Sequence, residues 1–102
     1  PERDVPQDLI INLVISTDVR DAGVSDSILD TINYSTVSKF VLAEVSETRF
    51  YTVEKLATHL CQKVLEQFPS AEGVLVRVEK PKAVSRTAKV GVEIYRERGD
   101  LP

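Results

Sequence analysis

Lys80 stands immediately before a proline, between two stretches in which apolar and polar residues alternate. The alternation over 74–78 and over 90–94 is typical of half-buried strands, so we expect Lys80 at the end of a strand. Pro81 favours an extended backbone at the preceding residue, which limits the freedom of Lys80. In a partly dry pocket such a lysine could act as a base; the alternative is a solvated side chain at a strand end.

Glu54 is the second residue whose position could support chemistry. It falls in the first turn of a predicted helix, roughly 70° from the centre of an apolar stripe and at the margin of the core. A carboxylate there is stabilised by the helix dipole alone, by about 0.3–1 kcal/mol. At the edge of a pocket the same carboxylate could accept paired N–H donors from a ligand, and both interpretations stay open.

Tyr34 and Glu2 are weaker candidates on position alone. Tyr34 precedes the first predicted helix, and its ring could pack on the core or stack on a planar heterocycle. Glu2 lies in the polar segment 1–8, which contains two prolines, where a surface charge is the ordinary expectation.

The chain has one histidine and one cysteine. A single cysteine excludes an internal disulfide and fits a reducing compartment such as the cytoplasm. One histidine with one cysteine argues against a zinc cluster, and no metal site is predicted. His59 is expected to be exposed, opposite the apolar stripe, whereas Cys61 borders that stripe and is expected to be buried.

The composition is that of one globular domain. The 102 residues are 42% hydrophobic and 28% charged, which is too apolar for a disordered chain. The net charge of −3 gives no support for nucleic acid or anionic lipid as a partner. No apolar run approaches the roughly 20 residues of a membrane span, so no membrane partner is predicted.

Periodicity then gives the elements that must position these side chains. We expect a strand in 9–19, a connection over 20–30, a helix from near Ser35 to before Ser46, a second helix from the N-cap Thr52 to before Pro69, and strands in 74–78 and 90–94. This order indicates an α+β fold with both helices on one face of an antiparallel sheet. Three strands are few for two helices, which suggests a missing strand or neighbouring subunits.

Three blocks taken together resemble the dihydroneopterin aldolase family: SDSILDTINYSTVSKFV, TRFYTVEKLATHL and RVEKPKAVSRTAKVGVEIYRERGD. The resemblance runs from about Leu9 to Asp100 and implies one domain over 1–102, with the family's first strand expected before Pro1. It implies a four-stranded sheet with two helices on one face, the tunnelling fold. Subunits would join edge to edge into a closed β-barrel ring, as a homo-tetramer or homo-octamer.

The resemblance also implies an activity in folate biosynthesis. The pterin substrate 7,8-dihydroneopterin would be cleaved to 6-hydroxymethyl-7,8-dihydropterin and glycolaldehyde, with no cofactor, metal or Schiff base. Lys80 matches the family's acid–base lysine, Tyr34 matches a tyrosine that approaches from a neighbouring subunit, and Glu2 matches the glutamate after the first turn.

The substrate-binding residues follow from the same resemblance. Glu54 matches the carboxylate that holds the pterin amino group and the adjacent ring N–H, and backbone groups of Val53 and Ile32 match others that face the ring. A related dihydroneopterin triphosphate epimerase is the alternative, although EKPKAV resembles the aldolases more. A non-catalytic copy within a multidomain protein is another, against which the presence of Glu54, Tyr34 and Lys80 together argues.

Overall fold

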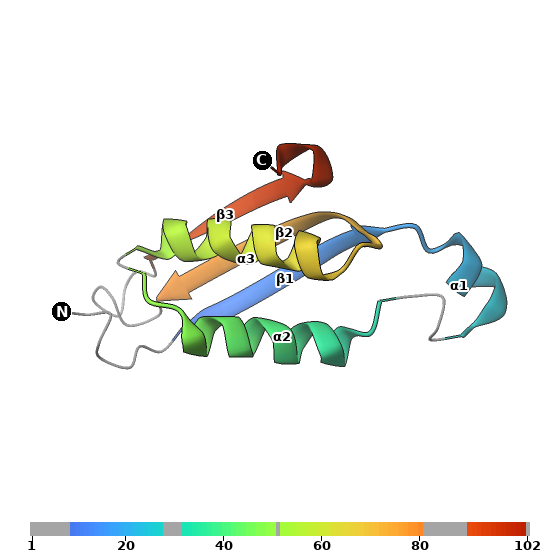
Figure 1. Cartoon of the computed structure of the whole chain (residues 1–102), viewed down its shortest axis with the longest axis horizontal. Helices are drawn as coiled ribbons and strands as arrows, with labels where there is room; N and C mark the ends of the chain where they lie inside the picture. The colour runs from blue at the N-terminus through green and yellow to red at the C-terminus, as the bar shows by residue number, and fades with distance from the viewer. Residues whose placement is uncertain (1–8, 28–31, 51, 81–89, 102) are drawn as a thin grey trace.

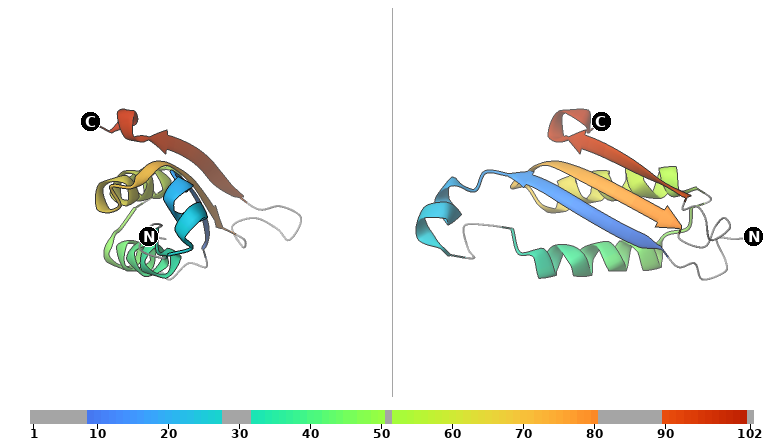
Figure 2. Two further views of the ribbon diagram at one scale, coloured as in Figure 1. Left: turned by 90° about the vertical axis from the view of Figure 1, so that its right-hand side faces the viewer. Right: turned by 180° about the vertical axis from the view of Figure 1, so that it is seen from behind.

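The computed structural model describes residues 9–27, 32–50, 52–80 and 90–101. Its sheet consists of β1 (Ile10–Thr17), β2 (Ala71–Lys80) and β3 (Val90–Glu97), in the order β1-β2-β3 with both pairs antiparallel. The helices α2 (Tyr34–Glu47) and α3 (Val53–Gln67) lie on one face of the sheet, and no described helix covers the other face (Figures 1 and 2). The α+β class predicted from the order of elements is confirmed.

The core lies between β2 and α3. Val74, Val76 and Val78 alternate along β2 and are fully buried, because α3 packs directly on the central strand. The same face continues into the outer strands, where Ile11 lies opposite Val78 on one side and Val92 on the other. The prediction of a half-buried strand is confirmed for β2, because its inner face is buried while Arg77 on the other face is exposed.

Both long helices begin at side-chain caps. The Asn33 side chain accepts hydrogen bonds from the backbone N–H groups of Ser35 and Thr36 at 3.0 and 3.2 Å, so α2 begins at Tyr34. The Thr52 hydroxyl accepts from the Lys55 N–H at 3.1 Å, which confirms the predicted cap of α3. The helix α3 ends at Gln67, two residues before the proline that cannot continue it.

Two short helices complete the described chain. The segment expected to be a plain connection contains α1 (Arg20–Ser25), which has no buried residue. Six residues without an apolar stripe give no periodic signal, so this helix could not be predicted from the sequence. The 3-10 helix η3 (Arg98–Asp100) follows β3. Among the described residues, no helix has both the length and the apolar character needed to cross a membrane.

Candidate functional site

Lys80 lies at the end of the molecule where α3 begins. Figure 1 shows that β2 ends on the same side as the first turn of α3. Side chains alternate along a strand, so Lys80 shares the inner, helix-bearing face of β2 with Val78. Lys80 is half-buried there. The fold therefore brings the lysine and the start of α3, which carries Glu54, to one end and one side of the sheet.

The first turn of α3 presents Glu54 to solvent. Val53 is only 8% exposed and anchors the turn in the core, whereas Glu54 is exposed. The Thr58 hydroxyl donates a hydrogen bond to the Glu54 carbonyl oxygen at 2.8 Å, which holds the backbone of this turn. Among the described residues the Glu54 carboxylate has no ion pair or hydrogen bond, so its oxygens remain available to an N–H donor.

Tyr34 and Ile32 lie at the opposite end of the molecule. Helix α2 runs opposite to α3 and begins at the far end of the sheet from the start of α3 (Figure 1). Its 14 residues correspond to about 21 Å. Tyr34 is 72% exposed, so the interpretation in which its ring packs on the core is wrong, and Ile32 is 5% exposed. One copy therefore does not bring these residues together with Glu54 and Lys80. Glu2 lies outside the described residues.

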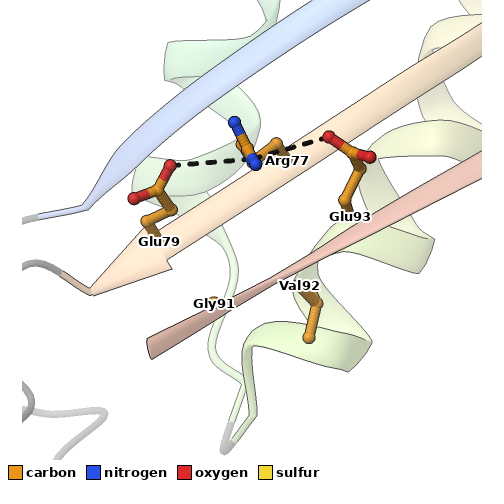
Figure 3. A pocket seen from close by; sticks show the side chains of 5 residues that line it. All are labelled: Arg77, Glu79, Gly91, Val92 and Glu93. Atoms are coloured by element: carbon orange, nitrogen blue, oxygen red, sulfur yellow. Dashed lines mark ion pairs between the residues drawn. The ribbon is translucent and has the colours of Figure 1, made fainter. Parts of the chain in front are cut away.

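A separate hollow of about 300 Å³ is lined by Arg77, Glu79, Gly91, Val92 and Glu93. In Figure 3, Arg77 lies between two carboxylates: its Nε is 3.7 Å from Oε1 of Glu79 and 3.5 Å from Oε1 of Glu93. Alternation places Arg77, Glu79 and Glu93 on the outer face, opposite Lys80. Sequence reasoning missed this hollow, since only the strand register sets Arg77 opposite Glu93.

The single histidine and single cysteine do not form a reactive pair. His59 was expected to be exposed, but its side chain is 19% exposed and its Nε2 lies 2.8 Å from Oε1 of Glu44. The prediction was wrong because α2 covers that side of α3. Cys61 is fully buried as predicted, and burial raises the pKa of its thiol to about 11. Within the described ranges, no three side chains of the metal-binding types gather into a possible metal site.

A family model described as dihydroneopterin aldolase matches residues 1–95 of this chain. The chain belongs to the dihydroneopterin aldolase family. A Streptococcus pyogenes dihydroneopterin aldolase is 30% identical over 99 residues, which cover 95% of this chain and 83% of the relative. The Escherichia coli enzyme is 34% identical over 95 residues, covering 93% of this chain and 77% of the relative. The resemblance stated from the three sequence blocks is confirmed.

Solved structures of this family share the fold. A candidate dihydroneopterin aldolase from Vibrio cholerae superposes with a TM-score of 0.88 at 34% identity, covering 95% of this chain and 81% of that one. The E. coli dihydroneopterin aldolase in complex with neopterin gives a TM-score of 0.84 at 33% identity, covering 93% and 82%. The antiparallel sheet with two long helices is thus the family's architecture.

Proposed function

We propose that this protein cleaves 7,8-dihydroneopterin by a retro-aldol reaction, giving 6-hydroxymethyl-7,8-dihydropterin and glycolaldehyde. The observation that carries the proposal is the match to the dihydroneopterin aldolase family over residues 1–95. The neopterin bound to the E. coli relative supports a pterin as the ligand. The position of Glu54 and Lys80 at one end and on one side of the sheet supports a single site that contains both.

Glu54 is the residue that binds the pterin ring. Its two carboxylate oxygens accept hydrogen bonds from the 2-amino group and from the adjacent ring N–H, a paired geometry that carries both strength and selectivity. The Glu54 carboxylate lies in the first turn of α3, where the helix dipole stabilises a negative charge. Backbone groups of Val53, beside Glu54, and of Ile32 from a neighbouring copy complete the contacts to the ring.

Lys80 is the acid–base residue, acting through a water molecule. A base removes the proton from the C2′ hydroxyl, the C1′–C2′ bond breaks, and C2′ leaves as the aldehyde carbon of glycolaldehyde. The electron pair of that bond moves into the dihydropterin ring, which serves as the electron sink, and C1′ then takes up a proton. Recapture of glycolaldehyde with C2′ inverted makes epimerisation a side reaction. Glu2 and Tyr34 assist proton transfer.

The proposed site is shared between two copies of the chain. Tyr34 and Glu54 lie at opposite ends of the molecule, so a tyrosine that reaches the pterin at Glu54 comes from a neighbour. The strands β1 and β3 are the outer strands of the described sheet, and their edges offer backbone groups for pairing. Joining edge to edge in a tetramer or octamer closes the sheets into a barrel and completes each site.

The test is incubation of the protein with 7,8-dihydroneopterin. We expect glycolaldehyde and 6-hydroxymethyl-7,8-dihydropterin in equal amounts, with a smaller amount of the C2′ epimer. Native mass spectrometry should give a mass of four or eight chains. Pterin binding without cleavage would indicate a non-catalytic copy, and epimerisation of dihydroneopterin triphosphate without cleavage would indicate the related epimerase.

A further inference from the structure

At Gly91 the backbone of β2 leaves no room for a side chain on β3. A Cβ at this position would be 2.5 Å from the carbonyl oxygen of Val78 and 2.9 Å from the Cα of Glu79. Real Cβ atoms essentially never come within 3.0 Å of a heavy atom outside their own residue and its two chain neighbours. Both obstructing atoms belong to the backbone of β2, so a side chain rotation cannot relieve the contact.

The two obstructing residues have little room to move. Val78 is fully buried and is paired on both sides, with Ile11 of β1 and Val92 of β3. Glu79 is paired with Ile10, and its carboxylate lies 3.7 Å from the guanidinium of Arg77, as Figure 3 shows. Lys80 is the last residue of β2 and pairs with Val90, the chain neighbour of Gly91.

We propose that Gly91 is a positioning residue for Lys80: the absence of a side chain at 91 lets the end of β2 lie against β3 with Lys80 opposite Val90. The inference rests on the proposed function, in which Lys80 is the acid–base residue. A side chain at 91 displaces the end of the ladder and moves the Lys80 amine relative to a pterin held at Glu54. Displacements of about 1 Å can lower turnover by about 100-fold.

Gly73 provides a matched control in the same pair of strands. A Cβ there would meet the hydroxyl and ring edge of Tyr95 rather than backbone. Tyr95 is 43% exposed on the outer face, so its ring can swing aside. Gly73 lies near the start of β2, far from Lys80. Gly73→Ala therefore makes the same chemical change in the same ladder without moving the lysine.

The first experiment compares Gly91→Ala with Gly73→Ala in steady-state cleavage and in neopterin binding. We expect Gly91→Ala to lower kcat by about tenfold or more, with the neopterin Kd within about threefold of wild type. Gly73→Ala should change both quantities by less than about twofold. The proposal requires a local displacement of Lys80. It would be overturned if Gly91→Ala left turnover unchanged, if it lowered affinity and turnover equally, or if the variant failed to fold.

A second experiment removes the lysine. If Gly91 acts through Lys80, the double variant Lys80→Ala/Gly91→Ala should have a kcat within about twofold of that of Lys80→Ala alone. Losses of kcat that add up from the two single variants would contradict the proposal. Amide NMR shifts give a readout that needs no activity. Gly91→Ala should move the signal of Lys80 and leave that of Glu54 in place. An inactive wild type would refute the proposed function, while these shifts would still decide whether Gly91 positions Lys80.

Discussion

His59 of α3 and Glu44 of α2 join the two long helices, with 2.8 Å between Nε2 and Oε1. The two side chains are 19% and 20% exposed, so water competes little for this contact. The ring of Phe50, in the connection between the helices, packs against the imidazole with a centroid distance of 5.1 Å. Together the three side chains hold α2 against α3 at the point where the chain passes from one helix to the other.

Replacing His59 with alanine should lower the free energy of unfolding by about 1–2 kcal/mol, because it removes both the hydrogen bond and the ring contact. Urea unfolding followed by circular dichroism measures this. Glu44→Gln keeps an oxygen acceptor and should lose less. Lys55→Ala, on an exposed position of the same helix, is the control and should stay within about 0.5 kcal/mol. Equal losses in His59→Ala and Lys55→Ala would contradict a role for the His59 contacts.

Arg98 holds the end of β3 to the end of α3. Its guanidinium donates hydrogen bonds to the carbonyl oxygens of Leu65 at 2.9 Å, of Phe68 at 3.2 Å and of Ala71. Carbonyls in the last turn of a helix lack intrahelical partners, and a cation there is favourable to the dipole.

We expect Arg98→Ala to lower the free energy of unfolding by about 2 kcal/mol. Arg98→Lys should recover only part of it, since one ammonium cannot match the planar guanidinium at three acceptors. Thermal unfolding of both variants tests this. Arg49→Ala is the control, since within the described ranges the exposed Arg49 side chain donates a hydrogen bond only to the neighbouring Thr48 carbonyl, at 3.3 Å. A lysine variant as stable as wild type would show that charge alone accounts for the effect.

Cys61 lowers the free energy of unfolding as the pH becomes alkaline. Burial raises the pKa of its thiol from 9.0 to about 11, opposed in part by the charge of Arg96. The folded state favours the neutral thiol, so the thiol's contribution is complete below about pH 9 and is lost as the pH rises towards 11. One pKa unit corresponds to about 1.4 kcal/mol, which limits this loss to about 2–3 kcal/mol.

The measurement for Cys61 is urea unfolding at about pH 8 and about pH 10.5. Cys61→Ala should be less stable than wild type at both values because of the cavity that it leaves, but its stability should fall less between them. In the native wild type, thiol reagents should react slowly at neutral pH and quickly once urea unfolds the chain. An identical pH dependence in both proteins would refute the linkage.

Much of the fold could be predicted because local signals agree with tertiary packing. In α3 the apolar stripe, the Thr52 cap and the stop before Pro69 all indicate the same helix, and the stripe proves to be the buried face. The alternation of β2 identifies its inner face for the same reason. The His59 prediction failed because periodicity describes one helix and carries no information on what a second helix covers.

The site was less accessible to sequence reasoning than the fold. Glu54 and Lys80 come to one end only because α3 and β2 run antiparallel in adjacent layers, and Tyr34 lies at the other end because α2 reverses direction. Spacing alone left each residue with two interpretations, and the family resemblance supplied the roles. The close approach at Gly91 depends on atomic positions that no sequence pattern contains.

Glu54→Ala should weaken pterin binding far more than it lowers turnover. The loss of two charge-assisted hydrogen bonds corresponds to about 3 kcal/mol, or a roughly 100-fold higher Kd, while kcat should fall by less than about threefold. Calorimetric titration with neopterin and saturating kinetics separate the two. Glu54→Gln keeps one acceptor and should bind with intermediate affinity. Glu72→Ala, an exposed carboxylate on β2, is the control, and a similar loss there would point to general electrostatics.

Lys80→Ala should have the opposite effect, because a proton-transfer group contributes in the transition state rather than in binding. We expect kcat to fall by about 10²–10⁴-fold, with the neopterin Kd within about threefold of wild type. Lys80→Arg should not restore turnover, since a guanidinium stays protonated and cannot serve as a base. Lys63→Ala, which removes an amine 3.7 Å from Glu66 on α3, is the control and should leave both quantities unchanged. Equal effects on affinity and turnover in both Lys80→Ala and Glu54→Ala would show that neither residue has the separate role proposed for it.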